Sequence, residues 1–429
     1  MGPIGAAPAA AELQMRVLVA RGFGGGCETA VAASPAWGAQ DVLAHAPWHE
    51  AEASRSRVRV LFGAAELVGQ TTLGDLGVAD GDRLTLVATS LPPVVTRAMA
   101  GQVKLWSPSS GECLRVLRGH ASSVYAATFS PEGSLVATAS LDHTARLWSA
   151  RSGECLWTLQ GHGRAVQSVA FSPDGGRVAT ASTDGTAKVW SASKGECLRT
   201  LEGHAAGLSS AVFSPDGHAI ATASADGTAR IWSADAATCL HTLHGHRGSV
   251  TSPAFSPDSQ ALATASVDGT AKIWMVSSGE CVRTLSGHSG FVKSVVFSPD
   301  GQAVATASGD GTAKIWSTSS GKCSCTLLDV SESFITSVQF SPDGRAVVTA
   351  STSGMARIWA TDGGKCLQTL RVSSDAVDSA EFSPDGKTVV TAHRDGKARF
   401  WGVGMTGCWR TIDANDDGDV VYASFSHSE

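Results

Sequence analysis

Five repeats of the sequence combine a histidine, a serine and an aspartate, the residue types of a hydrolase catalytic triad. One copy contains His162, Ser182 and Asp184 and ends at Trp190. Nucleophilic catalysis needs one serine that a positioned base and an oxyanion hole set apart from the others. Here the same residues return with a step of 42 residues, and the Gly-x-Ser-x-Gly turn that exposes a catalytic serine does not occur. The repetition indicates a structural role, so we expect no enzyme.

An acidic segment near the end of the chain has the alternating oxygen ligands of a calcium-binding loop. Asp413, Asn415, Asp417 and Asp419 stand at alternate positions, as in loops where such oxygens converge on the ion. Ser424 stands at the twelfth position, where a bidentate glutamate completes an EF-hand, so that motif is excluded. We favour a solvated acidic turn, and a calcium loop between two strands is the alternative.

The composition argues against several classes of partner. There are 6 basic and 9 acidic residues before residue 92 and 27 basic and 30 acidic residues after it, so neither part suits nucleic acid or anionic lipid. No apolar run reaches the roughly 18 residues of a membrane helix. Eight of the 10 cysteines recur at one position of the repeat, which indicates packing residues rather than disulfides or zinc ligands. We expect no cofactor and an intracellular compartment, cytoplasmic or nuclear.

A recurring tryptophan sets the period of residues 93–429. Its intervals are 42 residues, with one interval of 43. Around each tryptophan lie four short runs rich in Val, Ile, Ala and Thr, and the separators Ser-Pro-Asp-Gly and Asp-Gly form turns. No run is long enough for a helix, so the period predicts four antiparallel strands per repeat. The tryptophans are Trp106, Trp148, Trp190, Trp232, Trp274, Trp316, Trp359 and Trp401.

These residues resemble the WD-repeat β-propeller family, whose repeats carry a Gly-His pair, a tight turn at an aspartate and a tryptophan near the end of the third strand. The resemblance covers residues 93–429, although the aspartate that usually follows the tryptophan is absent. It implies a mainly β fold of four-stranded antiparallel blades closed into a ring, which removes free sheet edges. We expect eight blades, the closing one built from residues 93–117 and 419–427. The inner strands begin near Val124, Val166, Leu208, Val250, Val292, Ile335, Val377 and Val420.

The resemblance also implies a hydrogen-bonded tetrad of His, Ser, Asp and Trp that ties the loops of a blade to its third strand. Later repeats depart from this pattern, since Ser351 and Ser353 lack a histidine and His393 replaces the serine. We expect these later blades to be less rigid. The complete tetrads are His120, Ser140, Asp142, Trp148; His162, Ser182, Asp184, Trp190; His204, Ser224, Asp226, Trp232; His246, Ser266, Asp268, Trp274; and His288, Ser308, Asp310, Trp316.

The first ninety residues lack the period and contain no lysine. Their pattern predicts strands at 15–20, 28–32, 57–62 and 84–87 and a helix at 36–45. Arg-Val-Leu-Phe-Gly at 59–63 and Asp-Arg-Leu-Thr-Leu-Val at 82–87 resemble the second half of a ubiquitin-like domain. The resemblance implies a small α+β domain of the β-grasp type at 13–90, after flexible residues 1–12.

Two departures from ubiquitin limit the function of this domain. The chain runs from Val87 into Ala88 rather than into a Gly-Gly terminus, and no lysine is present for chain formation. The domain is therefore expected to act only as a docking surface. By match to the family's apolar recognition patch, the docking candidates are Phe23, Leu61 and Val87. Leu61 or Val87 as a core residue is the alternative.

In propellers of this family, one face receives the residues that flank the first position of the inner strand and the residue before the turn aspartate. Phe291 and Phe334 fall on adjacent blades with Lys293 between them, which resembles an aromatic anchor with a charged neighbour. Scattered surface aromatics are the alternative. The face candidates are Tyr125, Leu141, Gln167, Thr183, Phe291, Lys293, Phe334, Thr352, Asp378 and Arg394.

The sequence therefore predicts a non-enzymatic scaffold or adaptor for proteins or peptides. The propeller face would bind one partner, and the ubiquitin-like domain would dock a second, in the narrower version from the ubiquitin or proteasome system. A calcium-regulated propeller is the alternative, and an enzyme that uses the propeller face is less favoured because P-loop and Rossmann motifs are missing. We expect a monomer within larger complexes, without nucleic acid or membrane partners.

Overall fold

The computed structural model describes residues 15–21, 29–33, 57–62, 65–66, 73, 78, 83–89, 91–98, 101–328, 333–371, 375–405, 407–414 and 420–426. The chain splits into two compact units, Met1–Leu91 and Pro92–Glu429, and each is described by itself. In the first unit the description covers strand backbones and the buried side chains of Leu73 and Val78. Within all these ranges, no helix has the length and apolar character needed to cross a bilayer.

The first unit contains a mixed five-stranded sheet with the order β2-β1-β5-β3-β4. β1 pairs antiparallel with β2 and parallel with β5, and β5 pairs antiparallel with β3. The strands lie within two residues of their predicted positions; the predicted helix at 36–45 and the flexible segment 1–12 fall outside the described residues. The strands are β1 (Met15–Arg21), β2 (Thr29–Ala33), β3 (Arg57–Phe62), β4 (Ala65–Glu66) and β5 (Arg83–Thr89).

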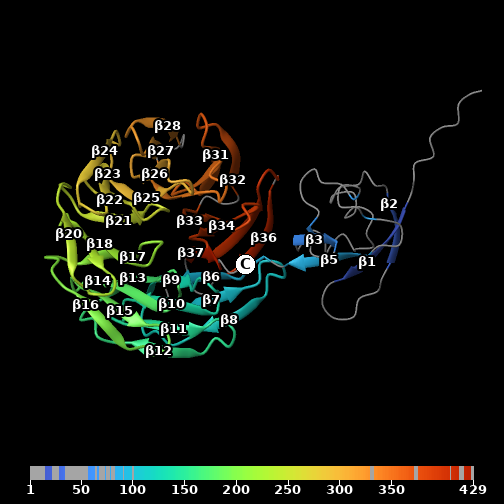
Figure 1. Ribbon diagram of the computed structural model, residues 1–429, viewed down its shortest axis with the longest axis horizontal. Helices are drawn as coiled ribbons and strands as arrows, with labels where there is room; N and C mark the ends of the chain where they lie inside the picture. Colours follow the sequence, from blue (N-terminus) through green and yellow to red (C-terminus); the bar gives the residue numbers. More distant parts are fainter. Residues whose placement is uncertain are drawn as a thin grey trace, which may run out of the picture. The chain divides into compact units, whose positions relative to one another are not determined.

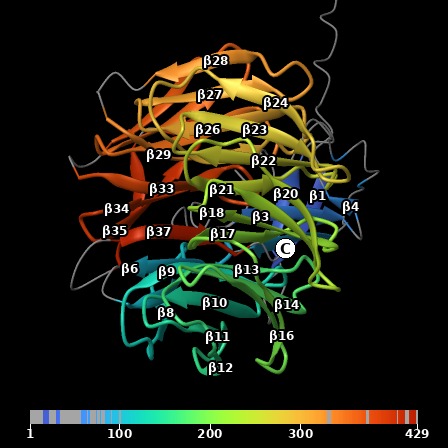
Figure 2. The same cartoon turned by 90° about the vertical axis from the view of Figure 1, so that its left-hand side faces the viewer.

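The second unit is a ring of eight four-stranded antiparallel sheets, so the predicted eight-bladed propeller is confirmed (Figure 1). Blades 1 to 7 are consecutive, from β9–β12 to β33–β36, and each runs from an inner strand at the axis to an outer strand at the rim. The closing blade has the order β37-β6-β7-β8, so the two ends of this unit meet in one sheet. Figure 2 shows the ring turned by 90°, with the blades stacked from β12 to β28.

Strands of the same type have nearly the same length in every blade. The inner strands are β9 (Val124–Phe129), β13 (Val166–Phe171), β17 (Leu208–Phe213), β21 (Val250–Phe255), β25 (Val292–Phe297), β29 (Ile335–Phe340), β33 (Val377–Phe382) and β37 (Val420–Phe425). The second strands are β10 (Leu135–Ser140), β14 (Arg177–Ser182), β18 (Ala219–Ser224), β22 (Ala261–Ser266), β26 (Ala303–Ser308), β30 (Ala346–Ser351), β34 (Thr388–His393) and β6 (Val94–Ala98). The third strands are β11 (Ala145–Ser149), β15 (Ala187–Ser191), β19 (Ala229–Ser233), β23 (Thr270–Met275), β27 (Thr312–Ser317), β31 (Met355–Ala360), β35 (Lys397–Gly402) and β7 (Val103–Trp106). The outer strands are β12 (Cys155–Leu159), β16 (Cys197–Leu201), β20 (Cys239–Leu243), β24 (Cys281–Ser286), β28 (Cys323–Leu328), β32 (Cys366–Arg371), β36 (Cys408–Asp413) and β8 (Cys113–Leu117).

The Ser-Pro-Asp-Gly separators form the turns between inner and second strands, as their composition predicts. In blade 2 the Ser172 hydroxyl accepts the backbone N–H of Arg177 at 2.9 Å, and the Asp174 carboxylate accepts that of Gly176 at 3.0 Å. Gly175 has φ +69°, a left-handed conformation that favours glycine. Side chains thus satisfy the turn backbone locally, which fixes the register of the two strands.

The core consists of clusters that each join two neighbouring blades. One cluster combines Ala179 and Ala181 of blade 2 with Ile220 and Trp232 of blade 3, all nearly or fully buried. Small alanines on the second strand let the sheets approach, and the large tryptophan of the next blade fills the remaining space. Because removing a buried tryptophan costs about 3–5 kcal/mol, these contacts hold the ring together.

Candidate functional site

One face of the propeller is built from the segments before the inner strands and the turns between second and third strands. Backbone hydrogen bonds tie these loops together: Gly309 donates to the carbonyl of Phe291 at 2.9 Å, and Thr352 to that of Phe334 at 3.0 Å. We call this surface the entry face. The turns between inner and second strands and the loops between third and outer strands share the opposite face, as the bond from the Ala192 N–H to the Gly176 carbonyl shows at 3.0 Å.

A β-bulge at the second residue of the inner strand aims side chains away from the ladder. In blade 5, Val292 pairs with Ser308 and Ser294 with Ala307, so Lys293 has no partner in the ladder. The same register shift occurs at Thr336 and at Asp378. An unpaired bulge residue re-aims its side chain, and these three side chains line the mouth of the central channel.

The mouth of the channel is a cavity of about 370 Å³. Its wall combines charged groups, hydroxyls and two phenol rings, with residues from blades 1, 5, 6 and 7 and from the closing blade. The lining residues are Arg97, Ser123, Val124, Tyr125, Lys293, Thr336, Ser337, Asp378, Ser379 and Tyr422. Tyr125, Lys293 and Asp378 were candidates from the sequence, so the structure brings these three together.

Asp378 is already neutralised by an arginine of the same blade. Arg394 donates from Nε to Oδ2 of Asp378 at 2.9 Å and from Nη2 to Oδ1 at 3.1 Å. The Asp378 side chain is 10% exposed in the wall, whereas the Arg394 side chain is 53% exposed on the entry face. Two predicted face residues therefore form one bidentate ion pair, an arrangement with fixed geometry.

Arg97 and Tyr422 contribute to the cavity and are not among the face residues that the sequence predicts. In the other seven blades the position of Arg97 on the second strand holds alanine, for example Ala307 or Ala350 opposite a serine. In the closing blade Arg97 stands opposite Tyr422, and its guanidinium lies 5.7 Å from the centre of the Tyr422 ring. Residues 94–106 align without gaps on residues 347–359, and the sequence signal is Arg97 at the place of Ala350.

Phe291 and Phe334 form an aromatic pair beside the cavity. Their ring centroids are 5.7 Å apart in an edge-to-face arrangement, and the two residues are 37% and 52% exposed. A Cβ atom on Gly309 would lie 2.3 Å from the Phe291 ring, so this glycine leaves the space in which the ring lies. The neighbours of both rings along the chain, Lys293 and Thr336, line the cavity. The two phenylalanines therefore form one exposed apolar patch rather than scattered aromatics.

The other face candidates lie on the entry face but not in the cavity wall. Leu141 is 40% exposed, and its N–H donates to the Ser123 carbonyl at 2.8 Å. Thr183 binds the Ala165 carbonyl through its N–H at 3.0 Å, and Thr352 accepts the N–H of Phe334 at 3.1 Å. Gln167 lies half-buried at the bulge of β13.

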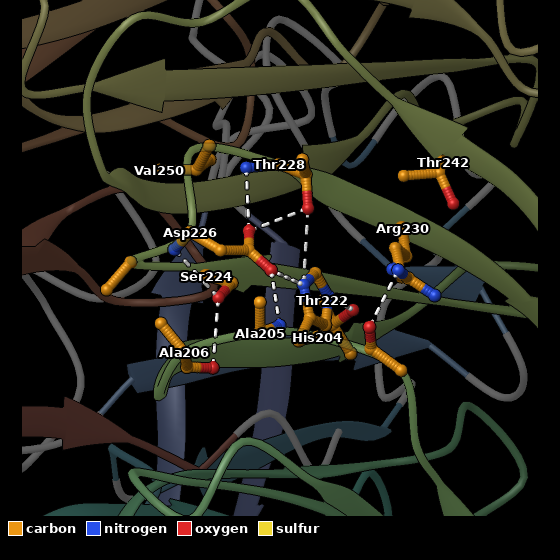
Figure 3. A network of polar contacts seen from close by, with 12 residues as sticks. His204, Ala205, Ala206, Thr222, Ser224, Asp226, Thr228, Arg230, Thr242 and Val250 are labelled. Atoms are coloured by element: carbon orange, nitrogen blue, oxygen red, sulfur yellow. Dashed lines mark hydrogen bonds and ion pairs between the residues drawn. The ribbon is translucent and has the colours of Figure 1, made fainter.

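The repeated polar residues form a chain of hydrogen bonds within each regular blade (Figure 3). In blade 3, Trp232 Nε1 donates to Thr222 Oγ1 at 2.9 Å, and the same hydroxyl lies 2.8 Å from His204 Nε2. His204 Nδ1 lies 2.8 Å from Asp226 Oδ2. Because the Asp226 carboxylate can only accept, His204 carries its proton on Nδ1 and accepts the Thr222 hydroxyl at Nε2. Each group therefore donates a hydrogen bond to the next, in the order Trp232, Thr222, His204, Asp226.

The structure corrects one member of the predicted tetrads. The hydroxyl between histidine and tryptophan belongs to a threonine that the predicted tetrad does not include, two residues before the predicted serine. Ser224 instead donates to the Ala206 carbonyl at 3.1 Å and accepts the N–H of Asp226 at 3.1 Å, so it ties the loop backbone. Its counterparts Ser140, Ser182, Ser266 and Ser308 contact the same loops. The linking threonines are Thr138, Thr180, Thr222, Thr264 and Thr306.

The aspartate of each tetrad is held as a carboxylate. Burial raises the pKa of Asp226, but hydrogen bonds from Thr228, His204 and the Ala205 N–H outweigh burial and hold it well below its usual range. Burial lowers the pKa of His204, against the opposing effect of Asp226. The pair is therefore a neutral imidazole and a carboxylate at neutral pH, with all three polar partners of the aspartate in place.

Blade 7 makes the histidine contact differently. His393 lies on the second strand, and its Nε2 is 2.8 Å from Thr391 Oγ1, which accepts from Trp401 Nε1 at 2.9 Å. Its Nδ1 has no partner among the described residues, since Asp395 is bound by Arg399 instead. Burial and the charge of Arg399 lower the pKa of His393 to about 4. The threonine–tryptophan link is thus retained, while the histidine–aspartate link is lost.

The remaining candidates are only partly within the described structure. Asp413 of the acidic segment pairs with Lys397 at 3.7 Å, and Asn415, Asp417 and Asp419 lie outside the described residues. In the described ranges no group of three His, Cys, Asp or Glu side chains is placed to hold a metal ion. Leu61 lies on β3 and Val87 on β5, whose backbones alone are described, and Phe23 is outside them. The calcium and ubiquitin-like docking sites stay predictions.

Comparison with known families supports the propeller. A family model described as the TolB beta propeller domain matches residues 213–429, half of the chain, and a model described as the WD domain, G-beta repeat, matches residues 111–149 and 153–191. The comparison with curated proteins gives no significant match. The chain therefore belongs to the TolB beta propeller domain family, and its propeller is of the WD-repeat type.

Proposed function

We propose that this protein is a non-enzymatic interaction scaffold whose entry face binds a peptide or a protein. WD-repeat propellers generally bind proteins or peptides. The observation that carries the proposal is the exposed pair of Phe291 and Phe334, in ring contact at the edge of a cavity. Aromatic residues with a charged neighbour are typical centres of binding energy in interfaces. The tetrads serve the fold, since each contact within them is already made inside the blade.

The first unit would recruit a second partner as a ubiquitin-like docking domain. The sheet order β2-β1-β5-β3-β4 with a parallel β1–β5 pair is compatible with a β-grasp sheet and supports this proposal. Phe23, Leu61 and Val87 remain the proposed docking residues, and components of the ubiquitin or proteasome system are the narrower choice of partner. Two linked binding units would raise the effective concentration of one partner near the other.

Two other functions are less well supported. A calcium-regulated propeller would need an ion at Asp413, whose carboxylate is 3.7 Å from the Lys397 ammonium. An enzyme would need one polar group that differs from its repeats, and the tetrads do not provide it. Titration with millimolar calcium, read by calorimetry and melting temperature, tests the first alternative; a binding heat would support it.

Affinity capture from cell extract with mass spectrometry tests the scaffold. We compare full-length protein with a variant carrying Phe291→Ala and Phe334→Ala and with Leu240→Ala, a matched change of an exposed apolar residue on the outer strand β20. A set of partners that is lost with the double change and retained with Leu240→Ala supports the proposal. Identical partner lists for all three proteins would contradict it.

A second pair of changes, Leu61→Ala and Val87→Ala, tests the first unit. Loss of a separate set of partners at an unchanged melting temperature supports docking through these residues. A lower melting temperature of the first unit instead identifies them as core residues and removes them from the docking surface.

A further inference from the structure

The cavity at the channel mouth offers hydrogen-bond donors in excess of acceptors. Arg97 uses Nη1 for the Val124 carbonyl at 3.0 Å, but its buried Nε has no partner among the described residues. Ser337 Oγ accepts the N–H of Ala380 at 3.2 Å, and Ser379 Oγ accepts that of Ala423 at 3.2 Å. These bonds leave both hydroxyl hydrogens free to donate. A ligand that fits this wall therefore has to bring acceptors.

The charges of the cavity also favour a ligand that brings acceptors. Both carboxylate oxygens of Asp378 are occupied by Arg394, so the one acidic side chain in the described wall is matched. Lys293 and Arg97 have no ion pair in the part of the chain that the structure describes. Burial lowers the pKa of Lys293, and the charges of Arg394 and Arg97 lower it further, while Asp378 opposes them. The two cations repel each other across the cavity, and an anion between them would relieve that repulsion.

The arginine is not required to build a blade. Its position holds alanine in the other seven blades, which form the same four-stranded sheet and the same bulge. The protein as a whole carries a formal charge of −6, so a pair of unmatched cations is not part of a generally basic surface. The charged residue at the position where the other blades have alanine, in the wall of the cavity, suggests a functional reason for Arg97.

We propose that this cavity is an oxyanion-binding site, in which Arg97 and Lys293 receive an acidic side chain of a peptide that docks on Phe291 and Phe334. This inference rests on the proposed function and specifies its ligand. A volume of about 370 Å³ holds a side chain rather than a folded domain. The Arg97 guanidinium and the Lys293 ammonium suit the oxygens of a carboxylate, or of a phosphate in the same place. The phenylalanine pair would hold an apolar residue of the same peptide.

Selection from a random peptide library displayed on phage, against immobilised full-length protein, provides the probes. We expect the selected peptides to share an Asp or Glu at a fixed distance from an apolar residue. Their affinities are then measured by fluorescence anisotropy for wild type, Lys293→Gln and Arg97→Ala, the latter restoring the residue of the other blades. Lys194→Gln is the control, since Lys194 is exposed in the loop between β15 and β16 on the opposite face.

We expect a double-mutant cycle to show strong coupling between the acidic residue of the peptide and Lys293. Replacing the acidic residue of the peptide by its amide should weaken binding to wild type about tenfold, as expected for a charge-assisted contact. The same replacement should weaken binding to Lys293→Gln and to Arg97→Ala by less than it weakens binding to wild type, and Lys194→Gln should behave like wild type. A phosphoserine at the acidic position that binds more tightly than Glu would identify phosphate as the oxyanion. Equal losses in wild type and Lys293→Gln would overturn the inference.

The two proposals fail in different ways. Peptides whose binding depends on Phe291 but which contain no acidic residue would refute the oxyanion site and leave the scaffold function standing. Selected peptides that bind Phe291→Ala as well as wild type would refute the docking patch itself. Unchanged melting temperatures of Lys293→Gln and Arg97→Ala show that the losses come from the cavity and not from the fold.

Discussion

Blades 1 to 5 and the three remaining blades use the same strands with different polar links. The first five close each blade with tryptophan, threonine, histidine and aspartate in one chain of hydrogen bonds, as in Trp232, Thr222, His204 and Asp226. Blade 6, blade 7 and the closing blade keep the tryptophan–threonine bond at 2.9, 2.9 and 2.8 Å. One link thus maintains the blade, and the histidine–aspartate link is an addition.

The irregular blades supply three of the residues that give the channel its polar and charged wall. Arg97, Asp378 and Tyr422 belong to them, and all three line the cavity. In blades 3 and 4 the bulge residues Ser209 and Thr251 instead donate to carbonyls of the next blade, at 2.9 and 2.8 Å. Thr336 of blade 6 does the same, at 2.7 Å from the Val377 carbonyl, whereas Lys293 of blade 5 and Asp378 of blade 7 present charge at the bulge, so both uses occur in regular and in irregular blades. Departure from the repeat coincides with the candidate site, as expected when a local rule is broken for function.

Removing the closing strand should have the largest effect on the stability of the ring. β37 supplies the inner strand of the closing blade, where Phe425 is fully buried and Ser426 donates to the Pro93 carbonyl at 2.8 Å. A variant without residues 419–429 leaves open sheet edges and should unfold or aggregate. Size-exclusion chromatography and thermal unfolding measure this, with a variant lacking only residues 427–429 as control. A soluble, equally stable long truncation would show that the ring closes without β37.

Glu381 should make the stability of the closing seam fall as pH rises from 4.5 to about 8. This fully buried carboxyl accepts the Ser424 hydroxyl at 3.0 Å, and burial raises its pKa from 4.5 to about 8. The folded state keeps the proton while the unfolded state loses it, so stability falls as pH rises between these values, by up to about 1.4 kcal/mol per pH unit. Glu381→Gln should flatten this dependence in denaturant titrations. The same slope in both proteins would show that Glu381 is not responsible.

His393 should make the protein less stable as pH falls, the opposite of the effect of Glu381. Its pKa is lowered from 6.5 to about 4, so the unfolded state binds a proton first and stability falls as pH drops through this range. His393→Ser introduces the residue that blades 1 to 6 carry at this position and should reduce the loss, again by up to about 1.4 kcal/mol per pH unit. Denaturant titrations at pH 7 and pH 4.5 give the comparison, and NMR titration of the imidazole provides a direct check. An imidazole that titrates near pH 6.5 would contradict the assignment.

The smallest expected changes in stability compare the linking threonine of a regular blade with that of blade 6. Thr222→Val leaves both the Trp232 N–H and His204 without a partner and should cost about 2 kcal/mol. Thr349→Val in blade 6 removes the partner of Trp359 alone and should cost about 1 kcal/mol. Chemical unfolding of both variants measures the difference. Equal costs would mean that the histidine adds nothing to the stability of a regular blade.

The period of the chain made the propeller predictable. Eight evenly spaced tryptophans and their turn residues gave the blade number and the beginnings of the inner strands, because each blade is a local unit of about 42 residues. The placement of Phe291 and Phe334 on adjacent blades also followed from the repeat, whereas their ring contact is seen only in the structure. The role of Thr180 rather than Ser182 did not, because both residues recur with the same period and only strand geometry shows which hydroxyl reaches the histidine.

The sequence by itself determined the repeat, the strands and the turns, which depend on residues close together in the chain. The tertiary structure decided which charges meet. Arg97 and Tyr422 are separated by most of the chain and become neighbours only when the ring closes, and the bulge that turns Lys293 and Asp378 toward the axis depends on pairing between strands. A site made of long-range contacts has no local signal beyond the departure of single residues from the repeat, and that departure acquires a meaning only in three dimensions.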